Sequence, residues 1–395
     1  MIIQINELSL FKSILKVQGG LNVIKHSSTL GLFNIWFWCC LNKCLISPTT
    51  CYFKVYFEVI MSIKPSIVRI RPVTENDLET LYELASKTGG GLTNLPMDRD
   101  DLLSRITKSN HSLTEPNNQS TFLLIAERVN DNHPLGVVGL FVQAGAKSGF
   151  YTYKIETHLN ASKQVDRKYL HDVLVLSGEY SDYAEIGALF VDPDARGKQL
   201  GKALVRASFL FVKQHRSIFP NKMCAEMRGW QGPNGEKPFW DEFLIKFFDM
   251  DFNQADKLNG TMGNYFLGEL MPRYPIYFAS LSQKIKDVIG VPHPDGKKAY
   301  EILQSEGLNL DGHHDPFDLG PCLSRDIELI ETVKNARQGS FCPLGVKAGL
   351  IGQGTNEDFE CFYDSEQTVD LSKLVSEYSC KDKINTGQIW IEKFE

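Results

Sequence analysis

The order of apolar and polar positions predicts alternating strands and helices from residue 67 onward. Short apolar runs bounded by turn residues indicate strands, and apolar residues three or four positions apart indicate helices. The predicted strands cover 67–71, 122–127, 137–142, 150–156, 172–176, 186–191 and 223–227. Helical spacing predicts helices over 78–85, 98–106, 200–211, 238–252 and 299–306. The chain is therefore expected to form a fold that mixes both kinds of element.

One strand–turn–helix segment, residues 185–211, has a composition suited to binding an anion. Its strand ends at the turn residues 192–194, and helical spacing resumes near residue 200. Backbone N–H groups at a helix start have no partner within the helix and carry the positive end of the helix dipole. The loop before the helix adds basic residues and glycines that admit a ligand: Arg196, Gly197, Lys198 and Gly201. A pyrophosphate would fit there, although an ordinary turn with solvated basic residues has the same pattern.

This segment resembles motif A of the GNAT acyltransferases, Arg/Gln-x-x-Gly-x-Gly/Ala after a strand. The resemblance implies an α+β fold with a mixed, mostly antiparallel sheet flanked by helices. It also implies that the loop binds the pyrophosphate of an acyl-coenzyme A, and that a backbone N–H after Leu189 polarises the acyl carbonyl. In that family two neighbouring strands splay to admit the pantetheine arm, here 186–191 and 223–227. Gln199 departs from the motif, because it stands where the first glycine usually falls.

Composition narrows the classes of function. The 395 residues carry a formal net charge of −6, which argues against a protein that binds nucleic acid through its phosphates. The nine cysteines include no Cys-x-x-Cys pair, so their spacing predicts neither a zinc site nor a redox dithiol, and we expect no bound metal. An odd number of cysteines without a regular framework is typical of a reducing compartment, so we expect a cytoplasmic protein.

The chain divides into four expected parts. Residues 1–60 form an extension that we expect to lie outside the folded enzyme, and a start at Met61 would remove it. The apolar stretch over 31–41 is shorter than the ~20 residues of a membrane-spanning helix, so membrane association is the less favoured alternative. The other parts are a GNAT-like acyl-CoA-binding core over 61–230, a substrate-side region of helices and loops over 231–335, and a small β-rich C-terminal module over 336–395.

Six longer blocks give a more specific resemblance. They cover 87–95, 185–194, 225–229, 238–252, 269–277 and 287–294. In composition and order they are similar to the arginine N-succinyltransferase family. The resemblance implies transfer of a succinyl group from succinyl-CoA to the α-amino group of L-arginine, which gives N2-succinyl-L-arginine and CoA and begins arginine catabolism by the succinyltransferase pathway. Succinyl-CoA would be a co-substrate and not a permanent cofactor, and the family suggests association of like or related subunits.

Two functional positions carry over from that family residue by residue. Leu189 matches a succinyl-CoA contact, and His293, in Ile-Gly-Val-Pro-His-Pro, matches the histidine assigned as proton donor. The two residues before His293 depart from the family pattern. Histidine titrates near neutrality and suits either proton step of acyl transfer to an amine. No comparable motif surrounds His158, His313 or His314.

The charges of the substrates predict two further positions. The guanidinium of arginine requires a planar carboxylate partner, and the carboxylate of the succinyl group requires a cation. Glu226 and Arg228 end a predicted strand and share one of its faces, because side chains alternate along a strand. We expect them to bind substrate, and a mutual ion pair at the surface is the alternative.

Two other hypotheses remain beside an arginine succinyltransferase. One is an enzyme of the same fold that acylates ornithine or another amine, or that uses acetyl-CoA. The other is an inactive GNAT-like protein that binds acyl-CoA or a partner without turnover, tethered to a membrane through residues 30–60. Gln199 and the short C-terminal module favour the inactive protein, whereas the intact basic loop and His293 favour the enzyme.

Overall fold

The computed structural model describes residues 67–89, 92, 94–146, 148–262, 265–339, 349–364, 371 and 388–391. The expected extension over 1–60 lies outside these residues, as does most of the apolar run over 341–351. All of the described residues belong to one unit, Phe57–Glu395. None of the helices in this part of the chain is long and apolar enough to cross a membrane.

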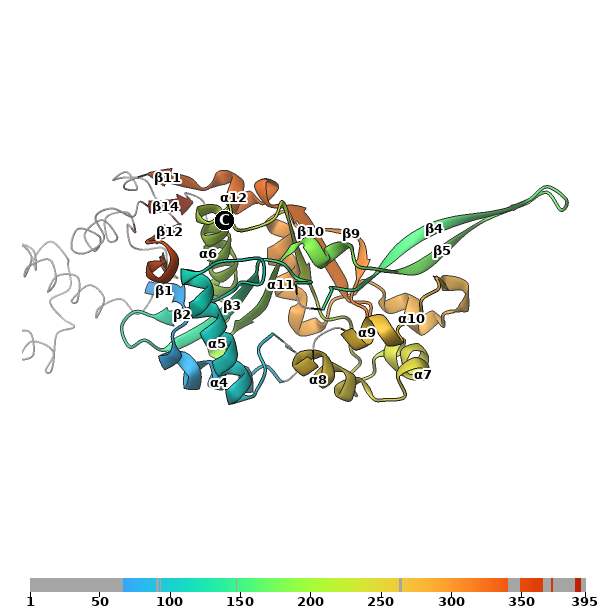
Figure 1. The fold of residues 1–395 in the computed structure, drawn as a ribbon, viewed down its shortest axis with the longest axis horizontal. Coiled ribbons are helices and arrows are strands. Elements are labelled where there is room, and N and C mark those ends of the chain that lie inside the picture. The colour runs from blue at the N-terminus through green and yellow to red at the C-terminus, as the bar shows by residue number, and fades with distance from the viewer. Residues whose placement is uncertain are drawn as a thin grey trace, which may run out of the picture. The chain divides into compact units, whose positions relative to one another are not determined.

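The described strands form one sheet in the order β11-β14-β12-β13-β1-β2-β3-β6-β7-β10-β9-β4-β5-β8 (Figure 1). Their bounds are β1 Ile67–Pro72, β2 Thr121–Arg128, β3 Pro134–Phe141, β4 Thr152–Ser162, β5 Arg167–Ser177, β6 Ala184–Val191, β7 Lys222–Glu226, β8 Ile276–Tyr277, β9 Asn309–His314, β10 Pro321–Asp326, β11 Arg337–Gly339, β12 Leu350–Gln353, β13 Glu360–Asp364 and β14 Gln388–Ile391. Of these strand pairs, only β6 with β7 is parallel. The predicted α+β fold with a mostly antiparallel sheet is confirmed.

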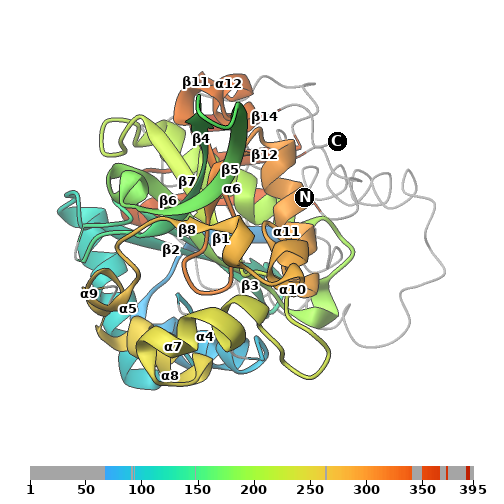
Figure 2. The same ribbon diagram turned by 90° about the vertical axis from the view of Figure 1, so that its right-hand side faces the viewer.

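Helices cover both faces of the sheet (Figure 2). Their bounds are α4 Leu78–Ser86, α5 Arg99–Thr114, α6 Leu200–Gln214, α7 Ile245–Phe248, α8 Phe252–Met262, α9 Tyr265–Leu270, α10 Gln283–Val288, α11 Lys297–Ser305 and α12 Glu331–Asn335. Strand β2 shows why there are two layers, because its side chains alternate. Phe122 and Leu124 pack in the core that contains α6, whereas Leu123 and Ile125 pack with α4 and α5.

The aromatic run that the sequence predicts as one helix over 238–252 folds into separate elements. A π-helical turn at Trp240–Leu244 leads into α7, which ends before α8 begins at Phe252. Trp240 is fully buried, and its ring stacks on that of Phe317 with centroids 5.6 Å apart. These rings form a second apolar core beneath the start of β4, so burial of bulky rings decides the shape of this segment.

Two other segments differ from the sequence expectation. Strands β4 and β5 are longer than the predicted 150–156 and 172–176, and they form a two-stranded ribbon that extends from the sheet (Figure 1). The described strands of the expected C-terminal module continue the core sheet, because β13 pairs with β1 from Asp364 to Cys361.

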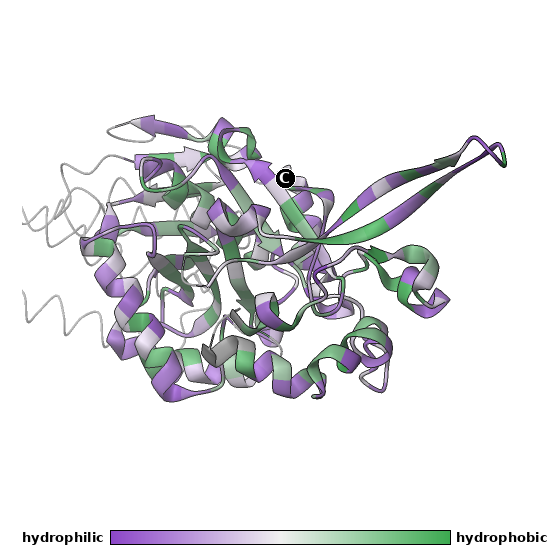
Figure 3. Ribbon diagram, turned by 45° about the vertical axis from the view of Figure 1, so that its right-hand side comes forward, coloured by the Kyte–Doolittle hydropathy of each residue, from purple (hydrophilic) through white to green (hydrophobic). Residues whose placement is uncertain are grey.

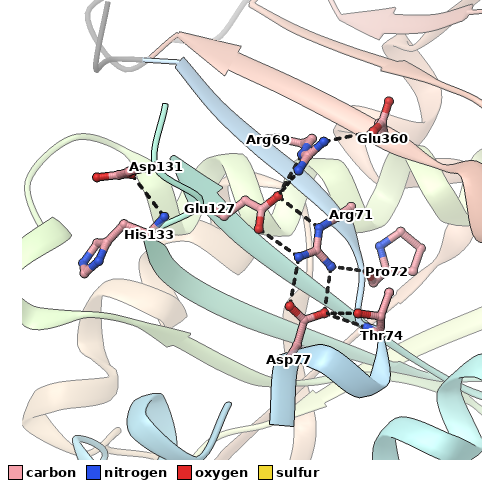
Figure 4. A network of polar contacts seen from close by, with 9 residues as sticks. All are labelled: Arg69, Arg71, Pro72, Thr74, Asp77, Glu127, Asp131, His133 and Glu360. Atoms are coloured by element: carbon pink, nitrogen blue, oxygen red, sulfur yellow. Dashed lines mark hydrogen bonds and ion pairs between the residues drawn. The ribbon is translucent and has the colours of Figure 1, made fainter. Parts of the chain in front are cut away.

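Figure 4 shows a polar network that joins β1, β2 and β13. Glu127 of β2 accepts hydrogen bonds from Arg69 and from Arg71, whose Nη2 lies 2.8 Å from Glu127 Oε2. Arg71 also donates to both oxygens of Asp77, and Arg69 reaches Glu360 of β13 at 3.4 Å. The Glu127 side chain is 3% exposed. One buried carboxylate thus connects the first described strand to its neighbours.

Candidate active site

Strands β6 and β7 separate soon after they meet. Ala184 pairs with Met223 and Glu185 with Cys224, and the parallel pairing ends there. Further along, β6 pairs with β3 and β7 pairs with β10. The rest of β6, up to Val191, therefore has no described strand on its β7 side, which agrees with the splayed strands expected from the GNAT resemblance.

A β-bulge lies in this part of β6, where it pairs with β3. Gly139 pairs with Gly187 and Val137 with Phe190, so two residues, Ala188 and Leu189, oppose one residue of β3. Ala188 has a φ of 49°, in the left-handed region. A bulge leaves its extra residue out of the ladder and redirects the backbone. The backbone beside Leu189 is therefore free of regular sheet pairing, as a site for a carbonyl oxygen requires.

The predicted phosphate loop connects β6 to α6. A 3₁₀ helix, Pro193–Ala195, ends the strand, and residues 196–199 are exposed. Gly197 has a φ of 89° and open space where a side chain would stand. The first turn of α6 holds no acidic residue, so its amide dipoles keep their positive potential. An anion can approach this helix start without meeting a side chain at Gly197.

Gln199 occupies the position immediately before α6. Its φ of 54° and ψ of 18° lie in the left-handed region. A residue with a Cβ pays about 1–2 kcal/mol to adopt this conformation, whereas glycine does not. The left-handed turn explains why the motif usually has glycine there, and here glutamine adopts that conformation.

Two contacts from distant parts of the chain hold the loop. The Tyr363 hydroxyl, on β13, donates to the carbonyl oxygen of Lys198 at 3.0 Å. Lys87 Nζ lies 2.7 Å from Asp192 Oδ2, and this hydrogen bond raises the pKa of Lys87. Arg196 is exposed, and its Nε donates to the Val191 carbonyl at 3.4 Å. The loop is therefore buttressed while its basic side chains remain at the surface.

His293 is positioned by its backbone and by its ring. Its amide donates to the carbonyl oxygen of Arg228 at 2.8 Å, and Gly229 forms an isolated bridge with Pro292. Nδ1 accepts a hydrogen bond from the Asp295 amide at 3.2 Å, so a neutral ring carries its proton on Nε2. Burial, and then the positive charge of Arg228, lower the pKa of His293.

The segment after β7 is fixed by one aspartate. Asp318 Oδ2 accepts from the Gly229 amide at 2.9 Å, and its Oδ1 accepts from the Gly320 amide at 2.8 Å. A Cβ on Gly229 would come within 2.5 Å of Asp318, so only glycine fits. Burial raises the pKa of Asp318, against the effect of these two amides. The turn thereby sets the backbone that presents Arg228 and receives His293.

Three carboxyl groups gather beside the parting strands: Glu185 is buried, and Glu226 and Asp315 are half-buried. Burial, and then the charge of Asp315, raise the pKa of Glu226 well above its usual range, and the two carboxyls share a hydrogen bond. Two carboxyls can do so only when one of them holds a proton. Burial raises the pKa of Glu185 to about 7, and Asn94 Nδ2 donates to Glu185 Oε1 at 3.2 Å. Near neutral pH this region therefore holds part of its carboxyl groups in the protonated form.

Helix α11 connects the two groups of residues. It begins four residues after His293, and a Cβ on Gly201 would meet its Ile302 at 3.3 Å. The 3₁₀ turn Pro294–Gly296 separates His293 from the helix, and from Lys297 to Ile302 the helix rises about 8 Å. His293 thus lies before the start of α11, and the start of α6 packs against the middle of the same helix.

Comparison with known proteins assigns the chain to a family. The model of the family described as "Arginine N-succinyltransferase beta subunit" matches residues 68–332. A protein of Enterobacter sp. (strain 638) named Arginine N-succinyltransferase is 36% identical over 300 residues, which cover 74% of this chain and 86% of that protein. The chain belongs to the arginine N-succinyltransferase family. An Escherichia coli O139:H28 protein of the same name is also 36% identical, over 68% of this chain and 78% of its own length.

A solved structure of a more distant protein has a similar fold. The arginine/ornithine succinyltransferase subunit AI from Pseudomonas aeruginosa superposes with a TM-score of 0.72 at 23% identity, and the match covers 83% of this chain and 99% of that one. At that identity the likeness concerns the fold, and it agrees with the α+β fold expected from the sequence.

The structure brings the predicted residues of this arginine N-succinyltransferase family member into two groups. The loop group holds Arg196, Gly197, Lys198 and Gly201, and the second group holds Glu226, Arg228 and His293, while Leu189 lies at the bulge of β6. Glu226 is half-buried and shares a hydrogen bond with Asp315, and Arg228 is also half-buried. Sequence reasoning assigned no role to Glu185 or Asp315. A carboxylate in the apolar run 184–191 was the available signal for Glu185.

Proposed function

We propose that this protein transfers the succinyl group of succinyl-CoA to the α-amino group of L-arginine, which yields N2-succinyl-L-arginine and CoA. Family membership supports the choice of reaction. The observation that supports the site is that α11 follows His293 and packs against the basic helix start at Gly201. An acyl-CoA would reach both places, because its pyrophosphate and thioester lie at opposite ends of the pantetheine arm.

Succinyl-CoA would bind along the parting of β6 and β7. Its pyrophosphate would accept hydrogen bonds from the amides of Gly197 to Gly201, with Arg196 and Lys198 adding charge. The pantetheine arm would follow the unpaired side of β6, and the thioester carbonyl would accept from the backbone at the bulge by Leu189. Donors that are already oriented stabilise the oxyanion of the tetrahedral intermediate without reorganisation.

The reaction requires the arginine ammonium to lose two protons. Glu185, whose pKa of about 7 suits a general base, would take the first and pass it to water. The amine then attacks the thioester carbon, and the second proton is lost as the amide forms. When the carbon–sulfur bond breaks, the sulfur needs one proton in return.

His293 would supply that proton. In the neutral ring, Nε2–H can stabilise the departing sulfur by a hydrogen bond, but a full transfer requires the imidazolium. The imidazolium would place its second N–H at Nδ1, where Asp295 Oδ2 is 3.8 Å away. Because burial and Arg228 lower the pKa of His293, its imidazolium is a stronger acid than usual and releases its proton readily.

The carboxyl groups of Glu226 and Asp315 would recognise arginine. A guanidinium between Glu226 and Asp315 would let both groups ionise, because its charge replaces the shared proton. Arg228 would hold the succinyl carboxylate near His293. The positive guanidinium of arginine and the negative carboxylate of the succinyl group would thus bind in separate parts of the site.

The decisive experiment is a thiol-release assay on the purified full chain. Succinyl-CoA and acetyl-CoA would be crossed with L-arginine, L-ornithine and L-lysine. We expect release with succinyl-CoA and arginine to exceed every other pair by at least tenfold in kcat/KM. Faster release with ornithine or with acetyl-CoA would replace the proposed substrate. Tight CoA binding without any release would favour the inactive acyl-CoA-binding protein.

Glu226→Gln tests the arginine site separately. It removes one charge-assisted hydrogen bond, worth about 1.5–3 kcal/mol, so we expect the KM for arginine to rise about 10-fold or more while the KM for succinyl-CoA stays within twofold. The matched control is Glu301→Gln on the exposed face of α11. In the unsubstituted enzyme the KM for arginine should rise as the pH falls, because a larger fraction of the carboxyl pairs is then protonated and cannot bind the guanidinium as carboxylates. A normal arginine KM in Glu226→Gln would exclude this carboxylate from substrate binding.

A further inference from the structure

The ribbon formed by β4 and β5 carries an apolar surface that the proposed reaction does not use. At its base it is paired on both sides, by β9 at Tyr153 and Lys154 and by β8 at Val173 and Leu174. Beyond that base, the two strands pair with each other as far as Ser162 and Arg167. Figures 1 and 3 show this arm reaching away from the rest of the described chain, with apolar and polar residues alternating along it.

The middle of the arm exposes two leucines side by side. Leu159 and Leu170 pair directly across the ribbon, and they are 60% and 71% exposed. A two-stranded ribbon with both faces in water is marginally stable on its own. Burial of apolar side chains contributes about 25 cal/mol per Å² of surface removed from water, so covering this pair stabilises the arm. The leucine face therefore has the character of a contact surface.

The charges that flank the leucines indicate what covers them. On the same face Asp172, paired with Thr157, lies two residues toward the base, and Lys168, paired with Ala161, lies two residues toward the tip. The Thr157 hydroxyl donates to Asp172 Oδ1 at 2.7 Å, which orients the carboxylate. From base to tip the face thus carries an acidic residue, the two leucines and a basic residue. When a second copy of the face is laid on it in the opposite direction, each acidic residue meets a basic one.

We propose that two copies of this chain associate through their arms, leucine face against leucine face, in an antiparallel arrangement. A two-fold axis that lies between the ribbons and crosses them at the leucine pair reverses the strand direction and sets β5 over β5. Leu170 then meets the partner subunit's Leu170, and Lys168 meets the partner subunit's Asp172 twice over. The small side chain of Ala161 faces the partner subunit's Thr157, so the ribbons can approach closely. An isologous contact of this kind closes as a dimer.

Analytical ultracentrifugation of the full chain tests the proposal. We expect the unsubstituted protein to sediment at twice the mass of the chain at micromolar concentration. Leu170→Lys places a charge on the axis, and we expect it to raise the dissociation constant at least 100-fold. A monomer at high micromolar concentration, or a complex only with a different subunit, would overturn the proposal. So would a dimer that Leu170→Lys leaves unchanged, because that dimer would use another surface.

Charge exchange identifies the register. Lys168→Asp and Asp172→Lys each set like charges against each other, so each variant alone should dimerise at least tenfold more weakly. The double variant restores both pairs within a homodimer. An equal mixture of the two single variants should also restore dimers, because one chain then offers two acids and the other two bases. If dimers return neither in the double variant nor in the mixture, this register is refuted. Dimers that return on mixing show that both single variants are folded.

The matched control is Arg167→Glu on the opposite face of the same arm, one residue from Lys168. It changes the net charge as Lys168→Asp does, and we expect the dissociation constant to stay within twofold. An equal weakening by Arg167→Glu would mean that the overall charge of the arm matters and that the leucine face has no special role. Thiol release by each variant shows that its catalytic unit is folded.

Discussion

The amide of His293 donates a hydrogen bond to the carbonyl oxygen of Arg228 at 2.8 Å. The contact joins two segments that are far apart in the sequence, the end of β7 and the start of α11. It brings the predicted proton donor beside the predicted partner of the succinyl carboxylate. The positive charge of Arg228 is also one of the reasons why the pKa of His293 is lowered. Recognition of the acyl group and protonation of the leaving sulfur are therefore expected to be linked through this pair.

His293→Gln separates hydrogen bonding from proton transfer. Glutamine keeps an N–H donor but cannot deliver a proton, so we expect kcat to fall about 100-fold or more. Steady-state thiol release measures the loss, and CoA binding by calorimetry should be unchanged. His111→Gln, at an exposed histidine of α5, is the control and should retain full activity. A His293→Gln enzyme that turns over normally would leave His293 at most a hydrogen-bonding role.

The pH dependence of turnover should reveal Glu185. Its carboxylate is the form that accepts a proton, so kcat/KM for arginine should rise with pH until the pH passes about 7. Glu185→Gln should lower the rate about 100-fold and abolish that acidic limb. The control Glu301→Gln should preserve the profile. An acidic limb that persists in Glu185→Gln would assign the base to another group.

Gln199→Gly should stabilise the protein. It relieves the left-handed strain at a φ of 54°, so we expect the free energy of unfolding to rise by up to about 1 kcal/mol. Chemical denaturation measures the change. Gln304→Gly, within α11, is the matched control and should lower stability by about 1 kcal/mol, because glycine is unfavourable inside a helix. A destabilised Gln199→Gly variant would mean that the glutamine side chain contributes more than its backbone costs.

Glu127→Gln should weaken the sheet where β1, β2 and β13 meet. The substitution leaves Arg69 and Arg71 without their shared carboxylate, and breaking a buried pair costs about 3–5 kcal/mol. Because both arginines are partly exposed, we expect a loss near 3 kcal/mol, measured by urea unfolding. Glu115→Gln, at the exposed residue that follows α5, should change stability by less than about 0.5 kcal/mol. An equal effect of both substitutions would contradict a structural role for the network.

Several elements were predictable because their signals are local. The apolar runs at 67–71 and 186–191 became β1 and β6, since turn residues bound both of them. The basic loop before α6 was predictable for the same reason, because glycines and basic residues next to a helix start act through their own backbone and charge. The motif around His293 likewise lies within a few consecutive residues.

Tertiary structure alone decided the properties that depend on distant residues. The pKa of Glu226 is raised first by burial and then by Asp315, which β10 and its preceding turn bring beside β7, and no sequence spacing indicates that proximity. The left-handed conformation of Gln199 became evident only with the turn into α6. The full length of β4 and β5 was also hidden, because exposed polar residues form a strand when a partner strand pairs with them and carry no strand pattern of their own. Local chemistry thus determined the loop and its neighbouring elements, and packing of remote segments decided which carboxyl groups and which surface the protein presents.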